Sequence, residues 1–434
     1  MRSTRFTALL PALCALWLVA ACEPRSTAPK LPAEPATGSW QGLITLPGGD
    51  IETAFELQRS SEQWAATLVN GQERFPIDEV SFTDGELVMR FAVFNNEIRA
   101  RLVDQELQGE LILVKRYGET QRLPFRARPG SEHAHPAQAS PATIDMSGRW
   151  SVWFNDEDGS SSPSIGEFAQ RGSRLFGTFV NTDGDHRYLS GHVTDNRFVL
   201  STFDGAHAYL FSGNVEDQKI ANAGFWSGNT WYQTWSGVRD ENVELPDAYD
   251  RTHMRGDTET LTFTFPDQNG TPVSFDDEMF AGKVVIITLS GTWCPNCNDE
   301  ARFLSTLYDQ YADDGLEIIT LMFEHFDDPQ IAVAQINKYR AKHTIRYTTL
   351  LAGISDKVQA AQQLPALDAV WAFPTTIFVD RDGRVRTIHT GFSGPGTGGY
   401  HERLKQEFQS LVVELIAEPE TRVDSESEDP VVAE

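Results

Sequence analysis

The chain is poor in cysteine and in positive charge. Its 434 residues include 4 cysteines, and 36 lysines and arginines stand against 62 aspartates and glutamates, for a formal net charge of −26. Because phosphate binding needs a basic face, this balance argues against nucleic acid as a partner. The length leaves room for more than one domain with its own core.

Long apolar runs are also missing. Only the stretch at residues 8–21, which follows Arg2 and Arg5, could enter a membrane. It is too short for a spanning helix, but it has the length and flanks of a signal peptide. It ends in "VAAC", which resembles the bacterial lipobox. That resemblance implies a signal peptide over residues 1–21 and a lipid anchor on Cys22 in the cell envelope, with Glu23 favouring the outer membrane of a host that has one.

A proline-rich segment over residues 22–37 reads as an extended tether. Two blocks of alternating apolar and polar residues follow, over 38–128 and 147–240, joined by a linker at 129–146. "GSW" at Trp40 is similar to "GRW" at Trp150, and "WAATLVN" in the first block is similar to "LFGTFVN" in the second at nearly the same offset. The sequence therefore predicts two antiparallel all-β domains, sandwiches or barrels, that arose by duplication.

After a second linker at 241–257 the pattern becomes α/β. We expect a hairpin around Asn269, buried strands at 283–290, 316–323 and 347–353, helices after Cys297 and at 329–342 and 355–363, and a further hairpin around Gly383. A last amphipathic helix ends near residue 417, and an acidic, disordered tail covers 418–434.

The chemistry of this region rests on "SGTWCPNC". A strand leads directly into Cys294 and Cys297, which start a helical pattern. The free N–H groups and dipole of a helix N-terminus favour a thiolate at the first cysteine, and the second is close enough to resolve a mixed disulfide. A metal site would need a second Cys/His pair, which the sequence lacks, and a bridge across so short a loop is a weak staple. We therefore predict a redox pair without metal or organic cofactor.

These motifs, with "FPTTIFVDRDGRV" downstream, resemble TlpA/ResA-like thiol–disulfide oxidoreductases of the thioredoxin superfamily. The resemblance implies a thioredoxin-like domain over 258–417 with an N-terminal hairpin and a helical insertion. It further implies a cis-proline at Pro374 facing the cysteines.

On the same resemblance, Trp293, Pro295, Asn296 and Thr375 have supporting roles. Thioredoxins carry a buried aspartate where this chain has Thr288. Glu300, on the helix face of Cys297, matches the glutamate that TlpA/ResA-like proteins place beside their cysteines, and an ordinary helix-start glutamate is the alternative.

The expected function is exchange with disulfides of protein substrates, and the resemblance favours a reductase to which an upstream thiol protein returns electrons. The alternative is a ligand- or protein-binding lipoprotein whose duplicated β domains are the working part and whose thioredoxin fold is a scaffold. The glycine-rich loop at 391–401 would permit close approach by a protein substrate, or would serve as a plain connection.

Overall fold

The computed structural model describes residues 34–61, 63–130 and 142–419. The predicted signal peptide, Cys22, most of the tether, part of the first linker and nearly all of the acidic tail lie outside these ranges. Among the described residues, no helix combines the length and the apolar character needed to cross a bilayer.

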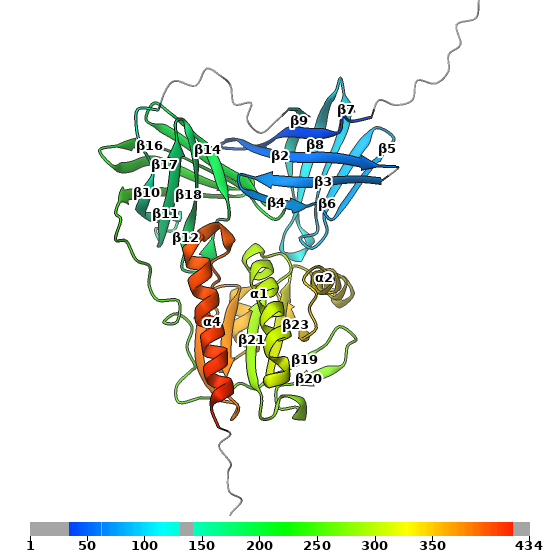
Figure 1. Cartoon of the computed structure of the whole chain (residues 1–434), viewed down its shortest axis with the longest axis vertical. Coiled ribbons are helices and arrows are strands. Elements are labelled where there is room, and N and C mark those ends of the chain that lie inside the picture. The colour runs from blue at the N-terminus through cyan, green and yellow to red at the C-terminus, as the bar shows by residue number, and fades with distance from the viewer. Residues whose placement is uncertain (1–33, 62, 131–141, 420–434) are drawn as a thin grey trace, which may run out of the picture. The chain divides into compact units, whose positions relative to one another are not determined.

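The first β region is an antiparallel sheet of nine strands in the order β4-β3-β2-β1-β9-β8-β7-β6-β5 (Figure 1). Its strands are β1 (Gly38–Leu46), β2 (Gly49–Ser60), β3 (Gln63–Asn70), β4 (Glu73–Pro76), β5 (Glu79–Thr83), β6 (Glu86–Phe91), β7 (Asn96–Val103), β8 (Glu106–Val114) and β9 (Thr120–Pro129). Along β1, Trp40, Ile44 and Leu46 are buried and their neighbours are not, as the two-residue period of a strand requires.

The second β region is also an antiparallel sheet of nine strands whose first and last strands pair, and its order is β11-β10-β18-β17-β16-β15-β14-β12-β13. Its strands are β10 (Gly148–Asn155), β11 (Ser161–Arg171), β12 (Arg174–Asn181), β13 (Gly184–Asp185), β14 (Leu189–Thr194), β15 (Arg197–Phe203), β16 (Ala208–Glu216), β17 (Lys219–Ser227) and β18 (Trp231–Arg239). Here β11 also pairs with β12, so the sheet closes into a barrel, whereas the first sheet keeps β4 and β5 as its edges.

Trp40 and Trp150 occupy the same place in the two sheets. Each is the third residue of the first strand, and each is almost fully buried. The indole N–H of Trp40 donates to the carbonyl of Ala36 at 2.8 Å, and that of Trp150 donates to Met146 at 2.9 Å. This detail and the pairing of the first strand with the last strand are common to the two sheets. The duplication itself stays a prediction from the sequence.

The C-terminal region is a five-stranded sheet in the order β23-β22-β21-β24-β25 with helices on both faces. Its strands are β19 (Thr264–Pro266) and β20 (Pro272–Ser274), which form a separate hairpin, then β21 (Val284–Ser290), β22 (Leu316–Glu324), β23 (Thr348–Ile354), β24 (Thr375–Val379) and β25 (Val385–Thr390). Its helices are α1 (Pro295–Tyr311), α2 (Pro329–Lys342), α3 (Lys357–Gln363) and α4 (Gly399–Ala417). The C-terminal region also contains the short 3-10 turns η2 (Glu278–Phe280), η3 (Ala312–Asp314) and η4 (Pro395–Thr397), whereas η1 (Arg116–Gly118) lies between β8 and β9 of the first β region.

The central strand β21 determines which edge of the sheet carries the cysteine pair. It runs parallel to β22 and antiparallel to β24, and all its residues are buried. Because β21 passes directly into the loop before α1, the helix N-terminus lies at the carboxyl end of the parallel strands. Ligands bind at this edge in open α/β sheets.

The segment at residues 241–257, predicted as a linker, contains no helix or strand but is attached to the C-terminal sheet. The backbone N–H of Thr390 donates to the carbonyl of Ala248 at 3.0 Å, and that of Arg255 donates to Ala366 at 2.7 Å. This path carries the chain from β18 back beside β25.

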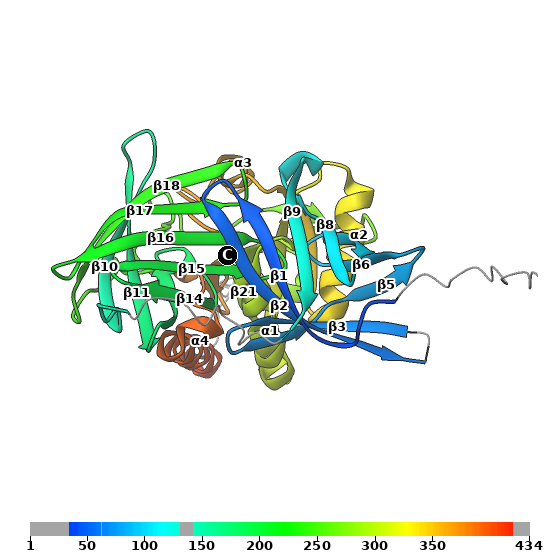
Figure 2. The same cartoon turned by 90° about the horizontal axis from the view of Figure 1, so that it is seen from above.

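Apolar cores join the three regions. Val93, which the sequence pattern places in a strand with Leu87 and Met89, lies beyond the end of β6 and packs in the core of α1, α2 and α4. Phe203 of β15 packs in the core of the first sheet. β2 lies beside β15 and β16, where the two β regions meet (Figure 2).

Phe203→Ala tests this shared core. The ring is fully buried and lies edge-on to Phe91 of the first sheet, with centroids 5.1 Å apart. Its removal should lower the free energy of unfolding by about 3–5 kcal/mol, because a cavity opens between two regions. Chemical denaturation followed by circular dichroism measures the loss. Val358→Ala, at a position that is 68% exposed, is the control and should cost under about 0.5 kcal/mol. A loss below about 1 kcal/mol for Phe203→Ala would contradict a shared core.

Candidate active site

Cys294 caps the N-terminus of α1. Its backbone is extended, and the helix begins at Pro295, a residue suited to the first helical position because no N–H donor is needed there. The backbone N–H of Cys297 donates to Cys294 Sγ at 3.2 Å. This N–H group and the helix dipole favour negative charge on the Cys294 sulfur.

The two cysteines form a disulfide. Cys294 is 5% exposed and Cys297 is fully buried. Any exchange partner therefore reaches Cys294 first, and Cys297 is placed to act from behind it.

The loop before β24 faces the disulfide. The peptide bond between Phe373 and Pro374 is cis, as the resemblance implies. Cys294 Sγ lies 3.4 Å from the carbonyl oxygen of Phe373. Thr375 is buried, and its hydroxyl donates to the carbonyl of Ala372 at 2.9 Å, which closes the turn.

Glu300 projects from α1 toward the sheet. The hydroxyl of Thr288 on β21 donates to Glu300 Oε2 at 2.6 Å, and the hydroxyl of Thr376 on β24 donates to Oε1. Burial raises the pKa of Glu300 to about 7, although both hydroxyl hydrogen bonds act to lower it. An acid one helical turn from Cys297 thus changes protonation near neutral pH.

Glu324, at the end of β22, is a second buried acid. It accepts hydrogen bonds from the backbone N–H of Thr292 at 3.0 Å and from the Thr292 hydroxyl at 2.6 Å. Burial raises its pKa to about 7 as well. Glu324 orients the loop that leads into Cys294, whereas Glu300 lies on the helix of Cys297.

The other residues of the motif hold this loop in place. The indole N–H of Trp293 donates to the carbonyl of Phe323 at 2.8 Å, and its ring stacks on His325 with centroids 4.8 Å apart. Pro295 is buried in the first turn. Asn296 points toward the second β region, where its amide meets the backbone of Gly184 so closely that a Cβ at Gly184 would overlap it.

Comparison with known proteins bears on this site. Residues 255–403 match the family model described as Redoxin. ResA, a thiol-disulfide oxidoreductase of Halalkalibacterium halodurans, is 26% identical over 166 residues, which are 38% of this chain and 80% of that protein. ResA of Bacillus thuringiensis is 28% identical over 137 residues, 31% of this chain and 70% of its own.

Among solved structures, a putative thiol:disulfide interchange protein DsbE from Chlorobium tepidum covers 38% of this chain and 99% of its own, with 17% identity and a TM-score of 0.30.

The C-terminal region is a TlpA/ResA-like member of the thioredoxin superfamily. The protein is a thiol–disulfide oxidoreductase of the thioredoxin family. In this thioredoxin-like domain the cysteine pair, the cis-proline loop and the buried glutamate come together around the start of α1.

Sequence reasoning missed the residues that approach the cysteine pair from the second barrel. A cavity of about 270 Å³ lies beside Cys294, and its opposite wall includes Asp185, His186, His207 and Tyr209. No motif marks these positions, because only the packing of the barrel against the thioredoxin-like domain brings them to the cysteines. Among the described residues, no group of His, Cys, Asp and Glu side chains is arranged to hold a metal ion.

Glu300→Gln should flatten the pH dependence of stability in the oxidised protein. The ordinary pKa of the side chain is 4.5 and the folded value is about 7, so the folded protein holds this proton more tightly than the unfolded chain. The stability that it contributes is present below the ordinary value and is lost as pH rises through the folded value. As the pH rises from about 5 to 8, the thermal unfolding temperature should therefore fall less steeply in Glu300→Gln than in the wild type.

Glu324→Gln is the matched control, because that acid is equally buried and its pKa is raised equally. Both variants should flatten the stability profile, but Glu300→Gln should change the pH profile of thiol–disulfide exchange more. If Glu300→Gln exchanged thiols like the wild type from about pH 5 to 9, Glu300 would be a structural acid only.

Proposed function

We propose that this protein is an envelope disulfide reductase that acts on protein substrates through the Cys294–Cys297 pair. The observation that carries the proposal is the position of Cys294, which caps α1 beside its disulfide partner and faces the cis-Pro374 loop. No cofactor or metal is needed for the reaction.

In the proposed cycle the thiolate of Cys294 attacks one sulfur of a substrate disulfide. The substrate S–S bond breaks, a mixed disulfide forms, and the released thiolate takes up a proton. The thiolate of Cys297 then attacks Cys294 Sγ, and the second substrate sulfur leaves. Two electrons pass from the dithiol to the substrate, and a donor thiol protein returns two electrons to the Cys294–Cys297 disulfide.

Glu300 is proposed to hold the proton that Cys297 releases before its attack. Its raised pKa supports this role, because a carboxylate that gains a proton near neutral pH can also return it. In the reduced protein, a Cys297 thiolate and the Glu300 carboxylate would oppose each other's ionisation and would titrate as a coupled pair.

The proposed location is the outside of the cell membrane, with a lipid on Cys22 as the anchor. The support is the signal peptide pattern and the lipobox-like end at "VAAC". The alternative, a binding lipoprotein that uses only its β domains, leaves Cys294, Cys297 and Pro374 without a purpose, because a scaffold needs none of them.

Cys297→Ser should trap the first intermediate. Without the second thiol, the mixed disulfide at Cys294 persists, and covalent adducts with substrate should be visible in non-reducing gels and by mass spectrometry. Cys294→Ser is the control and should trap nothing.

In the reduced wild type, iodoacetamide at mildly acidic pH should label Cys294 ahead of Cys297. Preferential labelling of Cys297 would reverse the assigned roles.

Cys22→Ser tests the anchor separately from the chemistry. The wild type should partition into the detergent phase and the variant into the aqueous phase, because two acyl chains hold a protein on a membrane stably. Disulfide exchange in solution should be the same in both. A Cys22→Ser protein that still enters the detergent phase would rule out the proposed lipid anchor.

A further inference from the structure

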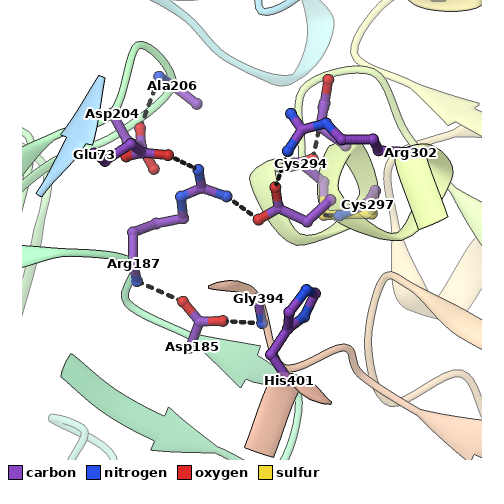
Figure 3. Close-up of polar contacts among 12 residues, drawn as sticks. Glu73, Asp185, Arg187, Asp204, Ala206, Cys294, Cys297, Arg302, Gly394 and His401 are labelled. Carbon is purple, nitrogen blue, oxygen red and sulfur yellow. Dashed lines mark hydrogen bonds and ion pairs between the residues drawn. A yellow bond between two sulfur atoms is a disulfide. The ribbon is translucent and has the colours of Figure 1, made fainter. Parts of the chain in front are cut away.

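A segment of the second barrel lies directly over the start of α1. Residues 182–188, called here the cover segment, include β13 and connect β12 to β14. At Gly184 the segment touches Asn296 of the active-site motif so closely that any side chain would collide. Figure 3 shows Asp185 and Arg187 of this segment on the side of the disulfide that faces the barrel.

The cover segment also fills the approach that the glycine-rich loop was expected to offer to a substrate. A Cβ at Gly391 would lie 2.7 Å from the backbone carbon of Asp183, and a Cβ at Gly396 would lie 3.0 Å from the backbone of Arg187. The backbone N–H of Gly394 donates to the carboxylate of Asp185 (Figure 3). The glycines therefore serve close contact with this chain's own barrel.

Buried charges hold the segment in place. The guanidinium of Arg187 pairs with Asp299 on α1 and with Glu73 at the start of β4. The side chains of Arg187, Asp299 and Glu73 are 11%, 2% and 15% exposed. Removal of one partner would leave a buried charge uncompensated, which is strongly unfavourable. Arg187 thus ties the barrel, the first sheet and the cysteine helix together.

What remains between the cover segment and Cys294 is the cavity of about 270 Å³. That volume lies below the roughly 300–1,000 Å³ of common small-molecule sites. Cys294 is only 5% exposed beneath it. A space of this size is suited to a single disulfide and its nearest atoms.

We propose that the second barrel selects substrates by the width of the group that carries the disulfide. In the covered arrangement, Cys294 exchanges with disulfides carried by a small molecule or by an extended, unfolded chain segment, and it excludes disulfides on folded proteins. This inference rests on the proposed function, because it concerns the first attack by Cys294, and it assigns Arg187 as a positioning residue that keeps the cover closed.

The test uses the reduced full-length protein and one leaving group on three carriers. 2-Nitro-5-thiobenzoate is attached as a mixed disulfide to free cysteine, to the single cysteine of an unstructured peptide, and to a surface cysteine of a folded protein. In each case the Cys294–Cys297 dithiol becomes a disulfide, and the carrier thiol and the coloured thiolate are released. The rates are normalised to those with dithiothreitol, which reports the intrinsic reactivity of each carrier.

The cysteine and peptide carriers should react at comparable normalised rates, and the folded carrier should react about 100-fold more slowly, as for a site that is open about 1% of the time. Equal normalised rates for all three carriers, still dependent on Cys294, would overturn the width selection and leave the proposed function standing. No Cys294-dependent release from any carrier would overturn both.

Arg187→Met should raise the ratio of the folded-carrier rate to the cysteine-carrier rate about tenfold, because it releases the cover segment. Arg187→Lys, which keeps the charge, should restore part of the wild-type ratio. Arg116→Met is the matched control. It removes an ion pair to Asp356 that joins the first sheet to the thioredoxin-like domain and involves no residue of the cover segment, and it should leave the ratio unchanged. If the ratio of the folded-carrier rate to the cysteine-carrier rate were the same in Arg187→Met as in the wild type, the role assigned to Arg187 would be contradicted. If Arg187→Met does not fold, the three-carrier comparison in the wild type decides the inference.

Discussion

The first two turns of α1 carry the constraint on which the rest of the site depends. Cys294 caps the helix and receives the N–H of Cys297. Asp299 meets Arg187 of the second barrel, and Glu300 points into the sheet to Thr288 and Thr376. Because one helix start carries all these groups, the Cys294 sulfur, the Glu300 carboxyl group and the ion pair between Asp299 and the barrel have fixed relative positions.

Buried charges lie where the second barrel meets the thioredoxin-like domain, although burial is costly for such groups because they lose their hydration. Apolar residues of similar volume often stabilise a fold at least as well as a buried ion pair. Ion pairs do, however, have a defined geometry, and Arg187 can satisfy Asp299 and Glu73 together in one arrangement of the three regions. The polar junction is therefore suited to fixing where the cover segment lies, while the shared apolar cores around Val93 and Phe203 supply the attraction between the regions.

The thioredoxin-like domain was predictable almost element by element because its signals are local. The helix predicted at 329–342 begins at Pro329 and ends at Lys342, and the hairpin around Asn269 lies between β19 and β20. The redox pair was predictable for the same reason, since a strand, two cysteines and a helix start are neighbours in the chain. The contacts of Glu300 needed more, because its hydroxyl partners come from β21 and β24.

The arrangement of the β region around the site was beyond sequence reasoning. Alternation in the strands predicted antiparallel sheets, but Val93 shows the limit of the pattern, since it continues the period of β6 and yet packs in another domain. Residues 182–188 contain no motif that marks them for a place at the site. Their place over Cys294 depends on surface complementarity between parts of the chain more than 100 positions apart, as between Arg187 and Asp299, and no local pattern encodes that.

The proposed chemistry depends most on Cys294 and Cys297 acting as one redox couple. A redox titration in glutathione buffers, with free thiols alkylated and counted by mass spectrometry, measures this directly. Both thiols should appear together in one two-electron transition, with a midpoint within the range of about −270 to −120 mV known for such enzymes. A pair that stayed oxidised or stayed reduced across all the buffers, or two thiols that titrated independently, would contradict it.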